Sequence, residues 1–165
     1  MERFESIILH VLKWEGGYIN DIDDAGGETK YGITKRQYPN IDIKNLTKDQ
    51  AIEIYHNDYW KPYLDQICSY KIAGRLFDLS INMGHKRPNK MLQTAVNKLG
   101  GNLSIDGDIG LKSIAGINAC DADKLYDVFY DLAKIRYKRI ANIRNNKKFL
   151  RGWMNRLNDP IIEEV

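Results

Sequence analysis

The feature that most constrains the fold of this 165-residue chain is a series of apolar residues at helical spacing, interrupted by glycines and prolines. Residues 2–14 are the first such segment, and the glycines at positions 16 and 17 end it. Similar spacing predicts further helices, which we expect at residues 48–61, 72–83, 88–99, 121–140 and 153–157. The sequence therefore predicts a mainly α protein.

Several residues indicate where these helices begin. Thr47 and Gln50 form a capping-box pattern before the second helix. Pro88 suits the first position of a later helix, and Asp121 can cap the longest one. One side of that longest helix is expected to carry the apolar residues Leu125, Val128, Phe129, Leu132, Ile135 and Ile140.

After the first helix comes the stretch WEGGYINDIDDAGGETKYG, residues 14–32, which is rich in glycine and in carboxylates. It shows no helical period, and its Asp, Asn and Gly residues favour tight turns or a short hairpin. We therefore expect a helical fold with one small irregular or β-hairpin acidic lobe near the N-terminus. Glu15 would lie at the end of the first helix, where the helix dipole disfavours a carboxylate.

The composition excludes several classes of protein. A net charge of +3 is far from that of a dedicated nucleic-acid binder, so we expect no nucleic-acid partner. Basic residues nevertheless gather at 134–139, 143–148 and 149–156. These segments are either solvated helix faces or a surface that attracts an anionic polymer.

The cysteines, histidines and hydropathy indicate a chain without metal or membrane anchor. A chain of this size needs no disulfide, so we expect Cys68 and Cys120 to be buried free thiols. The three histidines lack metal-ligand spacing, so we expect no metal and no cofactor. No segment has the length of a membrane span or the pattern of a signal peptide, so we expect cytoplasmic synthesis without stable membrane insertion.

The carboxylates of the acidic lobe are the groups best suited to chemistry. Cleavage of a glycosidic bond needs one protonated carboxyl group and one ionised carboxylate. Glu15 suits the acid role, because Trp14 can shield it from water and the helix end adds negative potential. Asp24 lies nine residues later across a turn, which leaves room for a water molecule. The alternative is that these acids only cap turns or bind a cation.

The segment EGGYINDIDDAGGETKYGIT, from Glu15 to Thr34, resembles the signature of glycoside hydrolase family 108. This family comprises phage-type N-acetylmuramidases, or endolysins. Residues 54–63 and 76–84 resemble segments that follow the signature in the family.

The end of the chain carries a second resemblance. From about Asn89 onward, the segments LSIDGDIG and FLRGWMNRL are similar to a small predicted peptidoglycan-binding region often fused to this family. Together the two resemblances imply a lysozyme-like fold with a catalytic region at 1–88 and a helical peptidoglycan-binding region at 89–165. We expect both regions to pack into one compact unit.

The resemblance also implies catalytic roles. The catalytic glutamate of the family falls on Glu15, and the spacing of Glu15, Asp24 and Thr29 is similar to that of the Glu, Asp and Thr of phage lysozymes, one residue short before the Thr. Asp24 and Thr29 would then hold the attacking water. Ile22 stands where the family often has proline, and Asp23 adds an acid beside it. Either Asp23 or Asp24 is therefore the second carboxylate.

Four further residues are candidate sugar contacts. Tyr18 and Tyr31 flank the acidic lobe and could stack on sugar faces, although each could instead pack in the core. Asp78 and Asn82 lie one helical turn apart. They could line the opposite wall of the cleft, or they could be hydrogen-bonded helix polar groups.

The resemblance implies a hydrolase that cleaves the β-1,4 bond between N-acetylmuramic acid and N-acetylglucosamine in peptidoglycan strands. One alternative is a lytic transglycosylase, which uses a single Glu and leaves a 1,6-anhydro sugar. Another is a non-catalytic peptidoglycan-binding or virion-structural module. We expect a monomer that acts in the periplasm or cell wall and gets there through a holin or a secretion system.

Overall fold

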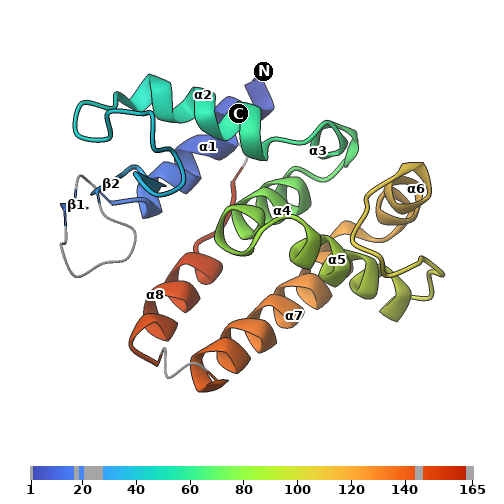
Figure 1. The fold of residues 1–165 in the computed structure, drawn as a ribbon. Coiled ribbons are helices and arrows are strands. Elements are labelled where there is room, and N and C mark those ends of the chain that lie inside the picture. Colours follow the sequence, from blue (N-terminus) through green and yellow to red (C-terminus); the bar gives the residue numbers. More distant parts are fainter. Residues whose placement is uncertain (1, 17–18, 21–27, 144–146, 163–165) are drawn as a thin grey trace. The chain divides into compact units, whose positions relative to one another are not determined.

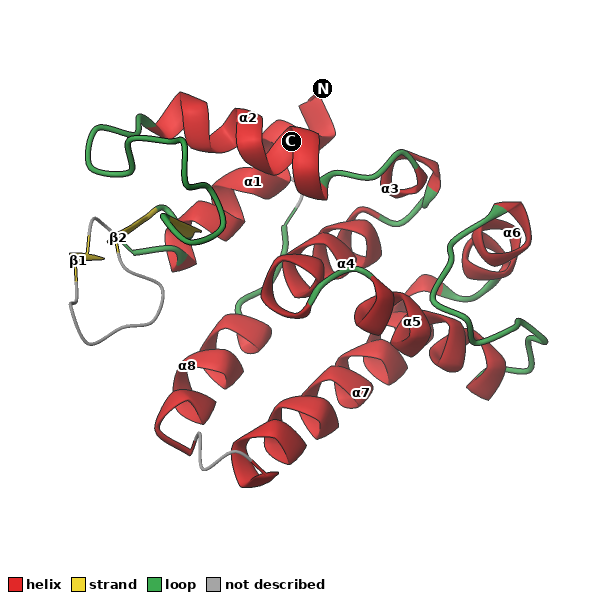
Figure 2. Ribbon diagram, in the orientation of Figure 1, coloured by secondary structure: helices red, strands yellow, loops and turns green. Residues whose placement is uncertain are grey.

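The computed structural model describes residues 2–16, 19–20, 28–143 and 147–162. The chain forms two compact units, Met1–Trp60 and Lys61–Val165. The described residues are mainly helical, with one small antiparallel sheet near the N-terminus (Figure 1, Figure 2). The mainly α fold class with a small β lobe is therefore confirmed.

The first unit contains two helices that pack against each other. They are α1, Glu2–Trp14, and α2, Lys48–Tyr59. The apolar face of α1 is buried, and Phe4 packs edge-on against Trp60 with ring centroids 5.3 Å apart. The buried residues of this face are Phe4, Ile7, Ile8 and Val11. This is the helix that the apolar periodicity predicts.

The capping box predicted before α2 is present. The Gln50 N–H donates to Thr47 Oγ1 at 3.2 Å, and the Thr47 N–H donates to Gln50 Oε1 at 2.9 Å. These bonds satisfy two backbone donors that a helix start would otherwise leave unpaired. The register of α2 is thereby fixed, which puts Tyr55 on its buried side.

The sheet lies between α1 and α2 in the sequence. Its strands β1, Ile19–Asn20, β2, Glu28–Lys30, and β3, Ile33–Thr34, pair antiparallel in that order. Lys30 pairs with Ile33, so Tyr31 and Gly32 form a two-residue turn with φ of 51° and 75°. Positive φ at both positions is what a type I′ hairpin needs, because its twist then matches that of the strands. The predicted hairpin lobe is confirmed for these residues.

The second unit is a bundle of helices around α7, Ala122–Ile143. The others are α3, Tyr63–Gln66; α4, Tyr70–Met83; α5, Lys86–Lys98; α6, Leu111–Ala119; and α8, Lys147–Asn158. α7 packs against α4, α5 and α8, and it runs side by side with α8 (Figure 1). Asp121 caps α7 as predicted, accepting from the Lys124 N–H at 2.9 Å.

One helix start in this unit was predicted wrongly, and one helix was not predicted. α5 begins at Lys86, so Pro88 occupies its third position and not its first. Proline is tolerated there because the first four N–H groups of a helix have no partner within it. α6 was not predicted at all, because it is short and Gly116 interrupts its apolar pattern.

The buried side of α7 also differs from the predicted one. The helix buries five residues that lie four positions apart, namely Leu125, Phe129, Ala133, Tyr137 and Ala141. Ile135, which was expected on the packed side, is 60% exposed. The small alanines allow neighbouring helices to approach closely, so the packed stripe follows them and not the largest apolar residues.

The prediction of two buried thiols was wrong. Neither cysteine forms a disulfide, but Cys68 is exposed and Cys120 is only half-buried. Cys68 lies in the short connection between α3 and α4, where its N–H donates to Asn118 Oδ1 at 2.9 Å. Burial raises the pKa of the Cys120 thiol.

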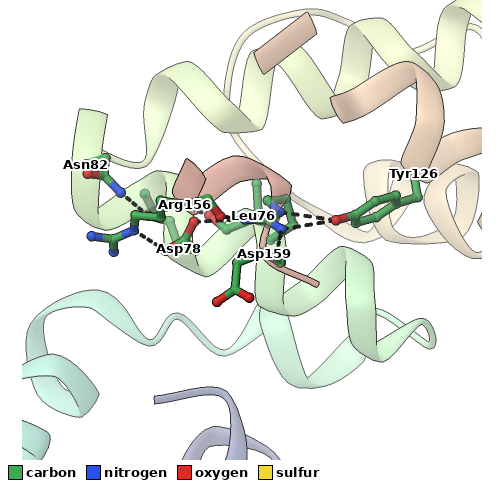
Figure 3. A network of polar contacts seen from close by, with 8 residues as sticks. Leu76, Asp78, Asn82, Tyr126, Arg156 and Asp159 are labelled. Atoms are coloured by element: carbon green, nitrogen blue, oxygen red, sulfur yellow. Dashed lines mark hydrogen bonds and ion pairs between the residues drawn. The ribbon is translucent and has the colours of Figure 1, made fainter. Parts of the chain in front are cut away.

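A buried ion cluster joins three helices of the second unit (Figure 3). Asp78 on α4 is only 1% exposed. Its Oδ1 accepts from Arg156 Nε on α8 at 2.7 Å, and its Oδ2 accepts from Arg75 Nη1 at 3.2 Å. The guanidinium of Arg75 also donates to the hydroxyl of Tyr126 on α7 and to the carbonyl of Asp159, at 3.3 Å and 2.7 Å.

We predict that Asp78→Ala destabilises the protein by about 3–5 kcal/mol, because it leaves two arginines without their buried counter-charge. The measurement is urea unfolding followed by far-ultraviolet circular dichroism. The control is Asp127→Ala on the exposed side of α7, which should change the free energy of unfolding by less than about 0.5 kcal/mol. Equal stability of the two variants would contradict the structural role of the ion cluster.

Candidate active site

Glu15 lies directly after the last residue of α1. Its N–H donates to the Val11 carbonyl at 3.2 Å and so continues the final helical turn. The next residue, Gly16, accepts from the Tyr31 N–H at 3.2 Å. This bond ties the end of α1 to the β2–β3 turn, which brings Glu15 to Tyr31 and Gly32.

Gly32 is the point of closest approach. A Cβ built on this residue would collide with Glu15 Oε2 and would lie 2.5 Å from the Tyr55 hydroxyl. Its φ of 75° is also one that residues with a side chain rarely adopt. Only glycine therefore allows the carboxylate of Glu15 and the hydroxyl of Tyr55 to meet the backbone of the turn.

The turn itself is held under backbone strain. Tyr31 has a φ of 51°, which is uncommon for a residue other than glycine. The Tyr55 hydroxyl donates to the Tyr31 carbonyl at 2.8 Å, and the Tyr31 N–H is bound by Gly16. Tyr55 is buried on α2, so its hydroxyl is a fixed support. The turn is thus hydrogen-bonded both to Gly16, just after α1, and to Tyr55 on α2.

A second tyrosine of α2, Tyr59, has a raised pKa. Burial is the largest cause of the raised pKa of Tyr59, and the negative charges of Asp58 and Glu15 add to it. The Tyr38 hydroxyl donates to Asp58 Oδ2 at 2.6 Å, and burial followed by this bond raises the pKa of Tyr38 as well. Both phenols therefore stay neutral at physiological pH and can serve as hydrogen-bond donors.

The structure describes only some of the other residues that were predicted for the site in this lobe. Thr29 is half-buried in the central strand β2, where it pairs with Ile19 and Thr34. Tyr31 occupies the β2–β3 turn, where its N–H donates to the carbonyl of Gly16, the residue after Glu15. Asp24, Asp23 and Tyr18 lie outside the described residues, so their roles stay predictions.

Asp78 and Asn82 lie on α4 in the second unit. Asp78 has the buried ion pairs described above (Figure 3), which agrees with its alternative reading as a core polar group. Asn82 is exposed, and its amide donates to the carbonyl of Asp78 at 3.0 Å. Their proposed contact with sugar stays a prediction.

Within the described residues, no group of three or more His, Cys, Asp and Glu side chains could hold a metal ion. Over the same residues, every helix is too short or too polar to span a bilayer.

Sequence reasoning missed Gly32, Tyr55 and Tyr59 as parts of the site. Tyr55 and Tyr59 lie four residues apart on α2, with ring centroids 5.6 Å apart. That spacing was a usable signal, but a chain with ten tyrosines offers many such pairs. The role of Gly32 was hidden because its partner Glu15 is distant in the sequence.

Comparison with protein families finds two matches that follow each other along the chain. Residues 8–84 match the family described as glycosyl hydrolase 108, and residues 87–158 match the one described as predicted peptidoglycan domain. The N-terminal half of the chain is thus similar to glycosyl hydrolase 108. Together the two matches indicate a glycoside hydrolase that acts on peptidoglycan.

A solved structure has a similar fold. The structure of Brucella abortus SagA matches this chain with a TM-score of 0.74 and 29% sequence identity. The match covers 93% of this chain and 88% of the other. A search of curated proteins found no match.

The boundary between the two family matches differs from the boundary between the two compact units. The matches meet between residues 84 and 87, whereas the compact units meet between Trp60 and Lys61. α3 and α4 therefore belong to the hydrolase match by sequence and pack within the second unit. The domain boundary expected after residue 88 stays a prediction.

We predict that Gly32→Ala lowers the rate of peptidoglycan hydrolysis by about 100-fold if Glu15 is the acid that the resemblance implies, because the added Cβ displaces its carboxylate. The control is Gly152→Ala in α8, where an added Cβ meets nothing within 4 Å. The measurement is the release of reducing ends from purified peptidoglycan. Full activity of Gly32→Ala would show that the contact with Glu15 does not position the acid.

Proposed function

We propose that this protein is an N-acetylmuramidase that hydrolyses the β-1,4 bond between N-acetylmuramic acid and N-acetylglucosamine. The observation that carries the proposal is the Glu15 carboxylate, held against Gly32 within the region that matches glycosyl hydrolase 108. Glycoside hydrolysis depends on such a positioned carboxyl group beside a second carboxylate.

In the proposed mechanism, protonated Glu15 donates its proton to the glycosidic oxygen as the bond to the anomeric carbon breaks. A water molecule held by Asp24 and Thr29 attacks the opposite face of that carbon and passes a proton to Asp24. The products are two sugars with free hydroxyl groups, and the anomeric configuration is inverted. Asp24 enters on the sequence resemblance, with Asp23 as the alternative carboxylate.

Binding of the glycan is proposed to use aromatic and polar side chains. Tyr31, held in the strained turn, would present its ring to a sugar face, and Tyr18 would add a second ring. Asn82 would contribute a polar contact. A substrate contact by Asp78 would require its arginine partners to move, so Asp78→Ala should affect stability before binding.

The proposed biological setting follows from the resemblance. The enzyme would act as a monomer in the periplasm or cell wall, after synthesis in a bacterial cytoplasm. A holin would release it if it is a phage endolysin, and a secretion system would do so if it is a bacterial muramidase.

We predict that Glu15→Gln lowers lysis by about 100- to 10,000-fold, because the amide cannot donate the proton that the leaving oxygen needs. The matched control is Glu5→Gln on the exposed side of α1, which should keep full activity. The measurement is the clearing of permeabilised Gram-negative cells, with folding checked by circular dichroism. Retained lysis by Glu15→Gln would refute the assignment.

The same preparations separate the rival functions. Mass spectrometry of the released fragments should show reducing ends, since Asp24 and Thr29 hold a water that a transglycosylase does not use. A 1,6-anhydro end would indicate a lytic transglycosylase. Binding to cell walls without clearing by the wild-type protein would indicate a non-catalytic module.

A further inference from the structure

A groove of about 680 Å³ lies in the second unit between the first half of α5 and the second half of α7. Five cationic side chains line it. Lys86, Arg87 and Lys90 come from α5, and Arg136 and Arg139 come from α7. Among the described residues that line the groove, none is acidic, and the first turn of α5 contains no acidic residue either.

The rest of the groove is largely apolar. Met83, Met91, Leu132 and Ile135 also line it. Ile135 is the residue that the packing of α7 leaves 60% exposed. Exposed apolar surface bordered by charged residues is typical of a binding site. A ligand that fits this groove combines negative charges with small apolar groups.

We propose that this groove binds the peptide stems of peptidoglycan through their carboxylates. The inference rests on the proposed function, because it names the part of the same polymer that the enzyme holds away from the scissile bond. Peptide stems are short chains with free carboxylates and alanine methyl groups. Arginine binds carboxylates through paired hydrogen bonds, and the methyl groups suit the apolar lining.

The charge distribution supports this ligand over a phosphate polymer. The whole chain carries a net charge of only +3, yet five cations gather in one groove. A nucleic acid needs a longer basic surface and makes little use of apolar side chains such as Leu132 and Ile135. Most of the groove also lies within residues 87–158, the match to the predicted peptidoglycan domain.

The test compares two charge-reversal variants in the Glu15→Gln background. Lys90→Glu with Arg139→Glu changes two exposed groove residues. Lys48→Glu with Lys112→Glu makes the same change in net charge at exposed positions outside the groove lining, near helix starts where glutamate is favourable. Binding to purified sacculi is measured by co-sedimentation, with and without enzymatic removal of the peptide stems.

We expect the groove variant to bind intact sacculi at least about 10-fold more weakly than its parent, and the control variant to bind within about 2-fold. Removal of the stems should weaken the parent to the same degree. Added salt should do so too, because the contacts are between charges near the surface. If the groove variant is unfolded by circular dichroism, the same comparison uses Lys90→Gln with Arg139→Gln.

Three results would overturn the proposal. The first is equal binding of the groove and control variants. The second is unchanged binding of the parent after the stems are removed. The third is tighter binding to phosphatidylglycerol vesicles or to duplex DNA than to sacculi, which would assign the groove to a membrane or a nucleic acid.

The groove and the proposed catalysis fail independently. With Glu15 intact, the groove variant should release reducing ends from stem-free glycan strands at the parent rate. Loss of that activity would contradict a role confined to the stems. Conversely, lysis by Glu15→Gln would refute the catalytic assignment and would leave the binding comparison on stem-free and intact sacculi valid.

Discussion

The buried carboxylate of Asp78 is the charge on which the packing of the second unit depends. It accepts hydrogen bonds from Arg75 and Arg156, and Arg75 reaches α7 and the chain after α8. Either arginine without this partner would be a buried, uncompensated charge, so loss of Asp78 alone would destabilise the packing of the three helices. The cluster also explains why α4 packs with helices of the peptidoglycan match although its own sequence belongs to the hydrolase match.

In the first unit, the corresponding constraint is that residue 32 has no side chain. Gly32 lets Glu15 Oε2 and the Tyr55 hydroxyl approach one backbone turn. The hydrogen bonds to Gly16 and Tyr55 hold Tyr31 in its strained conformation. Strain of this kind persists only where the surroundings determine it, and functional sites are where it gathers. Gly32 is therefore as much a part of the proposed mechanism as the carboxylate of Glu15.

The modest net charge is the sum of an acidic segment and a basic groove that have different proposed roles. The acidic residues of the N-terminal lobe are proposed to perform the chemistry, whereas the cations of α5 and α7 are proposed to hold the polymer. Opposite charges on separate elements nearly cancel in the total. The proposed groove includes Ile135, Arg136 and Arg139, which lie in the basic segment 134–139.

The sequence by itself determined much of the local structure and the resemblance to the hydrolase family. Periodicity and capping patterns predicted α1, α2, α4 and the cap of α7, because these depend on neighbours a few residues apart. The signature that begins at Glu15 indicated the hydrolase family. Only the tertiary structure decided that Asp78 is an ion-paired core residue, that Ile135 faces a groove, and that Gly32 meets Glu15. Each of these contacts joins residues distant in the sequence, so no local pattern of spacing or propensity could contain it.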